Sequence, residues 1–271
     1  MARERHPEPT PHGVGSTIGA GDGRPAGGVL VVIPARFGST RFPGKALADV
    51  HGRPLIVRVA ENARRVRLAD RVLVATDDAR IAAAVAGAGL DCELTGAHAT
   101  GTDRIAEVAA RHDAALVVNL QGDEPLLPPA DVEALIARMA REPGWDIGTC
   151  AHPFAGPDDW REPNVVKVVT GRDGRALYFS RAPIPGMFPG AERPGYEAAL
   201  RHVGIYAFRR EALLRFAALP RTPLEQAEGL EQLRALENGL TIGVVTVAGG
   251  PVGVDTPADL ERVRAAWPAG S

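Results

Sequence analysis

The sequence predicts an α/β fold: a Rossmann-like, mostly parallel sheet flanked by helices, with a smaller antiparallel insertion. Continuous apolar runs such as Val29–Ile33 are typical of strands that are buried on both faces. These runs alternate with segments of helical periodicity, which is the order expected of a parallel sheet. From about residue 146 the alternation gives way to short strands joined by turns, and we place the insertion at about residues 150–210.

The first half of the chain supplies most of the predicted sheet. Apolar runs predict its strands, and a period near 3.6 residues predicts its helices. The strands are expected at 29–33, 71–75 and 115–119, and the helices at 54–66, 81–88, 102–111 and 130–141. Because ligands of such folds bind at the carboxyl ends of the strands, we expect the site in the loops after Ile33, Ala75 and Asn119.

The remaining segments complete the fold. The insertion is predicted from strands at 165–170, 176–180 and 203–208, with Pro-rich loops at 181–195. The main domain resumes with helical patterns at 223–237, a strand at 241–247 and a helix at 257–266. Residues 1–28 are rich in Gly, Pro, His and Thr and lack periodicity, which predicts a disordered tail before one domain at 29–271.

Bulk composition narrows the function. A net charge of −2 gives no broad basic field for binding nucleic acid. No apolar run is long enough for a membrane span or for the core of a signal peptide, so we expect no membrane partner and a cytoplasmic location. Cys92 and Cys150 show neither metal-ligand nor redox spacing.

A glycine-containing basic loop follows the first predicted strand directly. Within residues 34–45, Arg36, Arg41 and Lys45 place three positive charges beside two glycines. Exposed backbone amides and cations of this kind suit a triphosphate, both for binding it and for stabilising charge that moves onto pyrophosphate. The alternative interpretation is a solvated basic loop without a ligand.

This loop differs from the phosphate loop of ATPases and kinases. Five residues separate Gly38 from Gly44 rather than four, and Ala46 stands where a magnesium-binding hydroxyl is needed. The lysine in the loop is also unusual, because Lys45 and Lys167 are the two lysines among 31 basic residues. Since arginine is not equivalent to a compact ammonium, we interpret Lys45 as functional and leave Lys167 open between function and chance retention.

Two aspartates are candidate ligands of Mg²⁺. Asp123 follows the apolar run at 115–119 in a turn between glycine and proline, and Asp255 has a similar setting after the last predicted strand. Mg²⁺ takes hard oxygen ligands and usually binds few protein carboxylates together with phosphate oxygens and water. The alternatives are a turn residue for Asp123 and a helix N-cap for Asp255.

Several blocks of the sequence, in this order, resemble the Kdo cytidylyltransferases, where Kdo is 3-deoxy-manno-octulosonate. The resemblance runs from about Val31 to Arg264 and begins with the loop at 34–45. The further blocks are ATDD at 75–78, GTDR at 101–104, NLQGDEP at 119–125, ALYFSR at 176–181, RHVGIY at 201–206, LEQLR at 230–234 and GVDTP at 253–257. Several blocks in the same order are more specific than any one of them.

The resemblance implies the nucleotide-diphospho-sugar transferase type of fold and a cytidylyltransferase domain at 29–271. It implies transfer of CMP from CTP to the anomeric 2-hydroxyl of Kdo, which gives CMP-Kdo and pyrophosphate and serves lipopolysaccharide synthesis. Mg²⁺ would be the cofactor, held by Asp123 and Asp255. The partners would be CTP, a sugar acid and a second copy of the chain.

The resemblance also assigns the remaining site residues. The catalytic positions are Arg36, Lys45 and Asp123. The nucleotide-binding positions are Ala35, Arg36, Ser39, Arg41, Lys45, Ala75 and Arg104. The sugar-acid positions are Gln121, Arg181, His202, Tyr206, Glu231 and Gln232. In the last group, Arg181 suits the carboxylate, and the polar groups suit the hydroxyls.

Other interpretations remain open at this point. Taken singly, Tyr206 fits a core position, His202 a satisfied strand position and Glu231 an exposed helix face. The same chemistry could use 8-amino-Kdo, Kdn or a neuraminic acid, or a sugar 1-phosphate with another nucleotide. The chain could also be a non-catalytic nucleotide-binding protein, but the basic loop and the two aspartates together argue against that.

Overall fold

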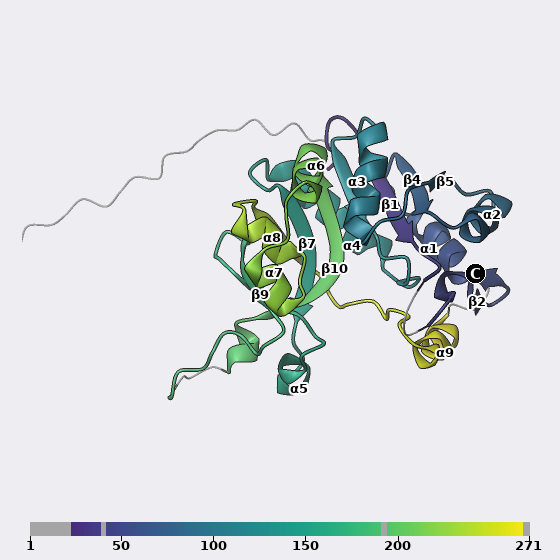
Figure 1. Ribbon diagram of the computed structural model, residues 1–271. Helices are drawn as coiled ribbons and strands as arrows, with labels where there is room; N and C mark the ends of the chain where they lie inside the picture. The colour runs from purple at the N-terminus through teal and green to yellow at the C-terminus, as the bar shows by residue number, and fades with distance from the viewer. Residues whose placement is uncertain (1–22, 39–41, 191–193, 268–271) are drawn as a thin grey trace, which may run out of the picture.

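The structure is a computed structural model that describes residues 23–38, 42–190 and 194–267. In these ranges a nine-stranded sheet has the main order β11-β7-β10-β6-β1-β4-β5, as Figure 1 shows. Neighbouring strands are parallel in β1–β4, β1–β6, β4–β5 and β11–β7, and β10 is antiparallel to both β6 and β7. The main strands are β1 (Val29–Ala35), β4 (Arg71–Thr76), β5 (Cys92–Leu94), β6 (Leu116–Asn119), β7 (Ile147–Pro153), β10 (Leu200–Arg209) and β11 (Ile242–Thr246). The mostly parallel sheet is therefore confirmed.

Helices cover both faces of the sheet (Figure 1), and each layer encloses its own apolar core. One face packs against α1 (Leu55–Ala63), α2 (Ala79–Gly87), α4 (Pro129–Arg141) and α9 (Pro257–Ala266). The other face packs against α3 (Gly101–Arg111), α6 (Arg210–Ala217) and α8 (Gln232–Glu237). None of the helices in the described ranges is long and apolar enough to cross a membrane, and the cytoplasmic location stays a prediction.

Short elements lie between these layers. They are η1 (Lys45–Leu47), β2 (Asp49–Val50), β3 (Arg53–Pro54), α5 (Pro157–Arg161), η2 (Gly195–Glu197) and α7 (Pro223–Glu228). The helical patterns predicted at 223–237 form two helices in the structure. Gly229, with φ of 62°, ends α7 in the left-handed conformation, and the chain turns there before α8 begins.

The insertion is smaller than the sequence predicts. Of its strands, β8 (Lys167–Thr170) and β9 (Ala176–Ser180) form an antiparallel ladder on one end of β10. β10 itself lies inside the main sheet, because it is ten residues long and pairs with β8 near one end and with β6 near the other. What projects from the fold is the loop between β9 and β10, together with α5 (Figure 1).

Of the tail predicted at 1–28, the structure describes residues 23–28, and these are not disordered. Residues 1–22 lie outside the described residues, whereas residues 23–28 pack onto the sheet. Arg24 forms an ion pair of 2.8 Å with Asp70, and the Gly28 carbonyl accepts a hydrogen bond from the Leu116 amide. Two glycines with positive φ at 27 and 28 let the backbone lie close to the start of β6.

Candidate active site

A pocket of about 530 Å³ opens at the carboxyl ends of β1 and β6. This is the edge of a parallel sheet at which ligands are expected. Its wall brings together eight residues predicted from the sequence, from segments far apart in the chain. They are Ala35, Arg36, Lys45, Arg104, Gln121, Asp123, Glu231 and Asp255.

Lys45 lies at the centre of the acidic part of this pocket. Its Nζ donates to Asp123 Oδ2 at 2.5 Å and to the Val254 carbonyl at 2.9 Å, and lies 3.4 Å from Asp255 Oδ1. The lysine and both carboxylates are only partly exposed, so their attraction is screened less than on an open surface. The cationic loop and the two distant aspartates therefore converge as predicted.

Local backbone geometry places each aspartate. A side chain on Gly122 would put its Cβ 2.8 Å from the Pro34 carbonyl, so glycine permits the loop after β6 to lie against β1. The predicted alternative for Asp255, a helix cap, is not what the structure has. Thr256 caps α9, and Asp259 closes the capping box, which leaves Asp255 one residue outside the helix on the pocket wall.

The two carboxylates form a donor set that fits a hard divalent cation. Asp123 Oδ2 and Asp255 Oδ1 both face the position that the Lys45 ammonium occupies, which is a position suited to a cation. The next residue, Glu124, has a buried Oε2 without a hydrogen-bond partner among the described residues. Burial, followed by the charges of Asp123 and Asp255, raises the pKa of Glu124 to about 8. At neutral pH Glu124 is therefore mostly protonated, and the negative charge at this position is that of Asp123 and Asp255, the two residues predicted to hold Mg²⁺.

The opposite wall is the amino end of α3 and the loop before it. Thr100 caps the helix by accepting a hydrogen bond from the Asp103 amide, and Thr100 and Gly101 line the pocket. The positive end of a helix dipole therefore faces the pocket, which favours an anionic ligand. His98, which the sequence analysis did not single out, lines the same wall.

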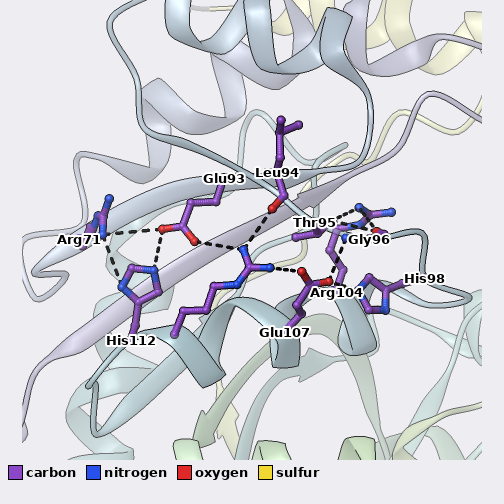
Figure 2. Close-up of polar contacts among 10 residues, drawn as sticks. Arg71, Glu93, Leu94, Thr95, Gly96, His98, Arg104, Glu107 and His112 are labelled. Atoms are coloured by element: carbon purple, nitrogen blue, oxygen red, sulfur yellow. Dashed lines mark hydrogen bonds and ion pairs between the residues drawn. The ribbon is translucent and has the colours of Figure 1, made fainter.

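A polar network holds that loop in place (Figure 2). Glu107 on α3 accepts hydrogen bonds from the Gly96 amide and from His98 Nε2, and it pairs with Arg111. Arg104, 3% exposed, donates to Thr95 Oγ1 and the Gly96 carbonyl and forms an ion pair of 3.1 Å with Asp77. The buried guanidinium thus joins the loop to the carboxyl end of β4.

A second cavity, of about 250 Å³, adjoins the first. Gln121 and Glu231 line both cavities, so the two share a wall. His202, Tyr206 and Gln232, which the resemblance assigns to sugar-acid binding, line the second cavity, and that role stays a prediction. Apolar side chains make up much of the remaining wall, and they are Ile147, Val166, Phe208, Phe216 and Leu230.

The polar groups of the second cavity are fixed by buried partners. Thr102, at the start of α3, donates to Glu231 Oε2 at 2.8 Å, and the Gln121 amide donates to the Gly204 carbonyl at 3.0 Å. Burial lowers the pKa of His202 to about 4. Burial, and then the charge of Glu231, raises the pKa of Tyr206 well above its usual range. At neutral pH the cavity therefore offers a neutral imidazole and a phenol to a hydroxylated ligand.

Two of the predicted residues that the structure describes, Arg181 and Ala75, do not line these cavities. Arg181 lies beside the second one: its Nε donates to the Glu228 carbonyl at 2.7 Å, close to Gly229, which lines that cavity. Ala75 is fully buried in β4, between Pro34 and Glu93 of the neighbouring strands, and its nucleotide-binding role stays a prediction. Ser39 and Arg41 lie outside the described residues.

Fold, site and family model together place the chain in a class of protein, the cytidylyltransferases. The family model described as cytidylyltransferase matches residues 30–242. A solved structure of a CMP:2-keto-3-deoxy-manno-octonic acid synthetase complexed with CTP is similar over 88% of this chain and 98% of its own. It has 45% sequence identity to this chain and a TM-score of 0.83.

Curated relatives are similar over nearly their whole length. The 3-deoxy-manno-octulosonate cytidylyltransferase of Syntrophotalea carbinolica is 51% identical over 88% of this chain and 97% of its own. The protein of the same name from Anaeromyxobacter sp. strain Fw109-5 is 54% identical over 89% of this chain and 98% of its own. The chain therefore belongs to the 3-deoxy-manno-octulosonate cytidylyltransferase family.

Proposed function

We propose that the chain transfers CMP from CTP to the anomeric 2-hydroxyl of Kdo, giving CMP-Kdo and pyrophosphate. The observation that carries this proposal is the pair of adjoining cavities. The larger one has the cations and the helix amino end that a triphosphate needs, and the smaller one has polar groups on an apolar lining. The names of the relatives support CTP as the donor and Kdo as the acceptor.

CTP would lie with its triphosphate between the loop after β1 and the amino end of α3. Arg36 and Lys45 would neutralise phosphate oxygens, and the α3 amides would add donors. The loop at 95–100 lies on the same wall and suits the base and ribose. Ala75, Ser39 and Arg41 complete the nucleotide-binding set as predictions from the sequence.

Kdo would occupy the smaller cavity. Its carboxylate needs a cation, and Arg181 lies at the rim beside Gly229. Its hydroxyls would meet His202, Tyr206 and the acceptor oxygens of Glu231, one of which has no hydrogen-bond partner among the described residues. This oxygen, Oε1, lies 3.7 Å from an Arg234 guanidinium nitrogen, an ion pair that leaves it free to accept a hydrogen bond from a ligand hydroxyl. The sugar acid would therefore satisfy Glu231.

Because the two cavities share a wall, the acceptor hydroxyl in one would lie next to the triphosphate in the other. The 2-hydroxyl oxygen of Kdo forms a bond to the α-phosphorus of CTP, and the bond from that phosphorus to the β-phosphate oxygen breaks. The electron pair leaves with pyrophosphate, and the hydroxyl proton passes to water. Lys45 and Arg36 would stabilise charge that grows on the departing pyrophosphate, while Gln121 and Glu231 hold the acceptor in line.

We propose further that Asp123 and Asp255 hold Mg²⁺ together with phosphate oxygens. When bound, the ion would neutralise the triphosphate and lower the pKa of the attacking hydroxyl. The donor set supports this assignment, since both carboxylates face the same position. Lys45 would then exchange its contacts with these carboxylates for contacts with phosphate.

A homodimer is the assembly we propose. The projecting loop between β9 and β10 carries Met187 and Phe188, which are 52% and 80% exposed. Apolar side chains exposed together on a projecting segment are typical of a surface that contacts a partner. Because most soluble oligomers are assembled from copies of one chain, we take the partner to be a second copy of this chain.

The test is pyrophosphate release by the purified enzyme, with CTP and Mg²⁺ and a panel of acceptors. We expect Kdo to be used, and Lys45→Met to lower kcat about 100-fold or more, because a charge that stabilises the transition state is removed. Preference for Kdn or 8-amino-Kdo would reject Kdo as the acceptor, and preference for a sugar 1-phosphate with UTP would reject the chemistry. CTP binding without pyrophosphate from any acceptor would indicate a non-catalytic protein.

A further inference from the structure

A fully buried lysine lies next to the smaller cavity. Lys167 begins β8 and has 0% of its surface exposed. With Lys45 it is one of two lysines among 31 basic residues, so arginine occupies the other cationic positions. A buried ammonium is costly unless each of its three donors is paired. The role of Lys167 therefore depends on which acceptors its three N–H groups bind.

Three backbone carbonyls converge on the ammonium. Nζ donates to the carbonyls of Glu162 at 2.8 Å, Val165 at 2.8 Å and Arg181 at 2.6 Å. Burial lowers the pKa of Lys167, while the charges of Glu162 and Glu228 act in the opposite direction. A tetrahedral ammonium points three N–H groups from one nitrogen, whereas no nitrogen of a planar guanidinium carries more than two. The geometry thus explains why lysine stands here in an arginine-rich chain.

The three carbonyls belong to two segments behind the cavity wall. Val165 precedes Val166, which lines the cavity. Arg181 follows β9, and its guanidinium reaches the other segment, where Nη1 donates to the Pro163 carbonyl at 3.3 Å. The same lysine therefore fixes the backbone of Arg181 and the segment that its guanidinium contacts.

We propose that Lys167 is a positioning residue for acceptor binding, which holds the Arg181 backbone and the 162–165 segment so that the Arg181 guanidinium faces the carboxylate of the sugar acid. This rests on the proposed function, in which the smaller cavity takes the acceptor. Lys167 does not line either cavity, so its effect passes through Arg181 and the wall. Its loss should affect the acceptor and spare the nucleotide.

Steady-state kinetics of Lys167→Met and Lys167→Arg test this role. We expect KM for Kdo to rise about tenfold or more in both variants, because a misplaced binding group costs at least that much. KM for CTP should stay within about twofold, because the nucleotide cavity is built from other segments. A rise of both KM values together, or full rescue by arginine, would show a general structural role and overturn the proposal.

Arg209 offers a matched control. Its guanidinium also donates to three backbone carbonyls, those of Trp145, Met139 and Glu142, and none of these three residues lines the cavities. Arg209→Met should lower the unfolding temperature while leaving both KM values within about twofold of wild type. If this variant raises KM for Kdo as much as Lys167→Met does, the effect is not specific to Lys167.

A measurement on the unaltered fold remains if the Lys167 variants do not fold. Protein labelled with ¹⁵N-lysine has two side-chain nitrogens, and Lys45→Met assigns the remaining signal to Lys167. We expect Lys167 protons that exchange slowly and a signal that shifts on adding Kdo without CTP. A signal that does not respond to Kdo would overturn the proposal. Absence of pyrophosphate from the wild type would instead reject the proposed function, and the Kdo-dependent shift would still decide the role of Lys167.

Discussion

At the scale of single residues, the Thr149 hydroxyl determines which nitrogen of His202 carries a proton in the smaller cavity. Thr149 Oγ1 lies 2.7 Å from the Ile205 carbonyl, 3.2 Å from the Val203 carbonyl and 2.9 Å from His202 Nε2. A hydroxyl has one proton, and the shortest contact takes it to Ile205. His202 Nε2 then donates to Thr149, so the neutral ring keeps its proton on Nε2 and Nδ1 can accept from a ligand hydroxyl.

The buried histidine predicts how stability depends on pH. Burial lowers the pKa of His202 to about 4 in the folded chain, whereas an unfolded histidine titrates near pH 6.5. The free energy that the neutral ring contributes is thus complete above about pH 6.5 and is lost as pH falls toward 4. Urea unfolding should show that wild type loses about 3 kcal/mol relative to His202→Gln across this range. A difference between the two proteins that stays constant from pH 7 to 4 would contradict this prediction.

Single residues also show what the sequence could predict. Lys45, Asp123 and Asp255 were predictable because each follows a buried strand in a turn, and strand ends of one sheet meet at one edge. His98 was not, because it lies in a loop without periodicity and only the fold brings it to the wall. Thr149 lies inside β7, and nothing in the sequence links its hydroxyl to the histidine 53 positions away.

At the scale of elements, side chains of α3 hold the loop at 95–100 in place. Glu107 joins Gly96 and His98 to the helix, and Arg111 donates to the Leu94 carbonyl at 3.1 Å (Figure 2). The His98 hydrogen bond is the main cause that lowers the pKa of Glu107. The nucleotide wall therefore depends on one charged side chain two turns into the helix.

Replacing that side chain tests the dependence. Glu107→Gln removes the charge that pairs with His98 and Arg111, and we expect KM for CTP to rise about fivefold, the equivalent of one hydrogen bond. KM for Kdo should change little, because the smaller cavity shares no contact with Glu107. Steady-state kinetics and calorimetric titration with CTP measure both.

Glu93→Gln is the matched control for this element. Glu93 pairs with His112 at 2.6 Å and lies in the outer half of the network, where it contacts Arg71 and Arg111 rather than the loop backbone. KM for CTP should therefore stay near the wild-type value. Equal effects of the two substitutions would mean that the network as a whole, and not Glu107, supports the loop.

The prediction of strands from apolar runs fails where polar residues or glycines interrupt the run. β7 is a main-sheet strand that the sequence analysis did not predict, because Thr149, Gly148 and His152 interrupt its apolar pattern. Gly148 is there because a side chain would place its Cβ 2.8 Å from Leu135 and Met139 of α4. The close packing of α4 thus favours a glycine at this position. The glycine interrupts the apolar run from which the strand would have been predicted.

At the scale of the whole molecule, the projecting loop has a firm base and an apolar tip. Trp160 of α5 is buried with Phe154 and Ala199, and its Nε1 donates to the Ile184 carbonyl at 2.7 Å. Met187 and Phe188 lie beyond this anchor and are exposed. A segment anchored at its base but apolar at its tip has its conformation set before a partner arrives, which lowers the entropic cost of association.

The tip therefore predicts the assembly. We expect the wild-type chain to sediment as a dimer at micromolar concentration, and the double variant Met187→Gln, Phe188→Gln to sediment as a monomer. In a two-fold dimer each side chain is buried twice, so the pair should contribute at least about 6 kcal/mol, or about four orders of magnitude in Kd. Leu224→Gln is the control, because Leu224 is 40% exposed on α7, outside the projecting loop, and its replacement should leave the dimer intact. A monomeric wild type, or a double variant that still dimerises, would show that the copies meet elsewhere or not at all.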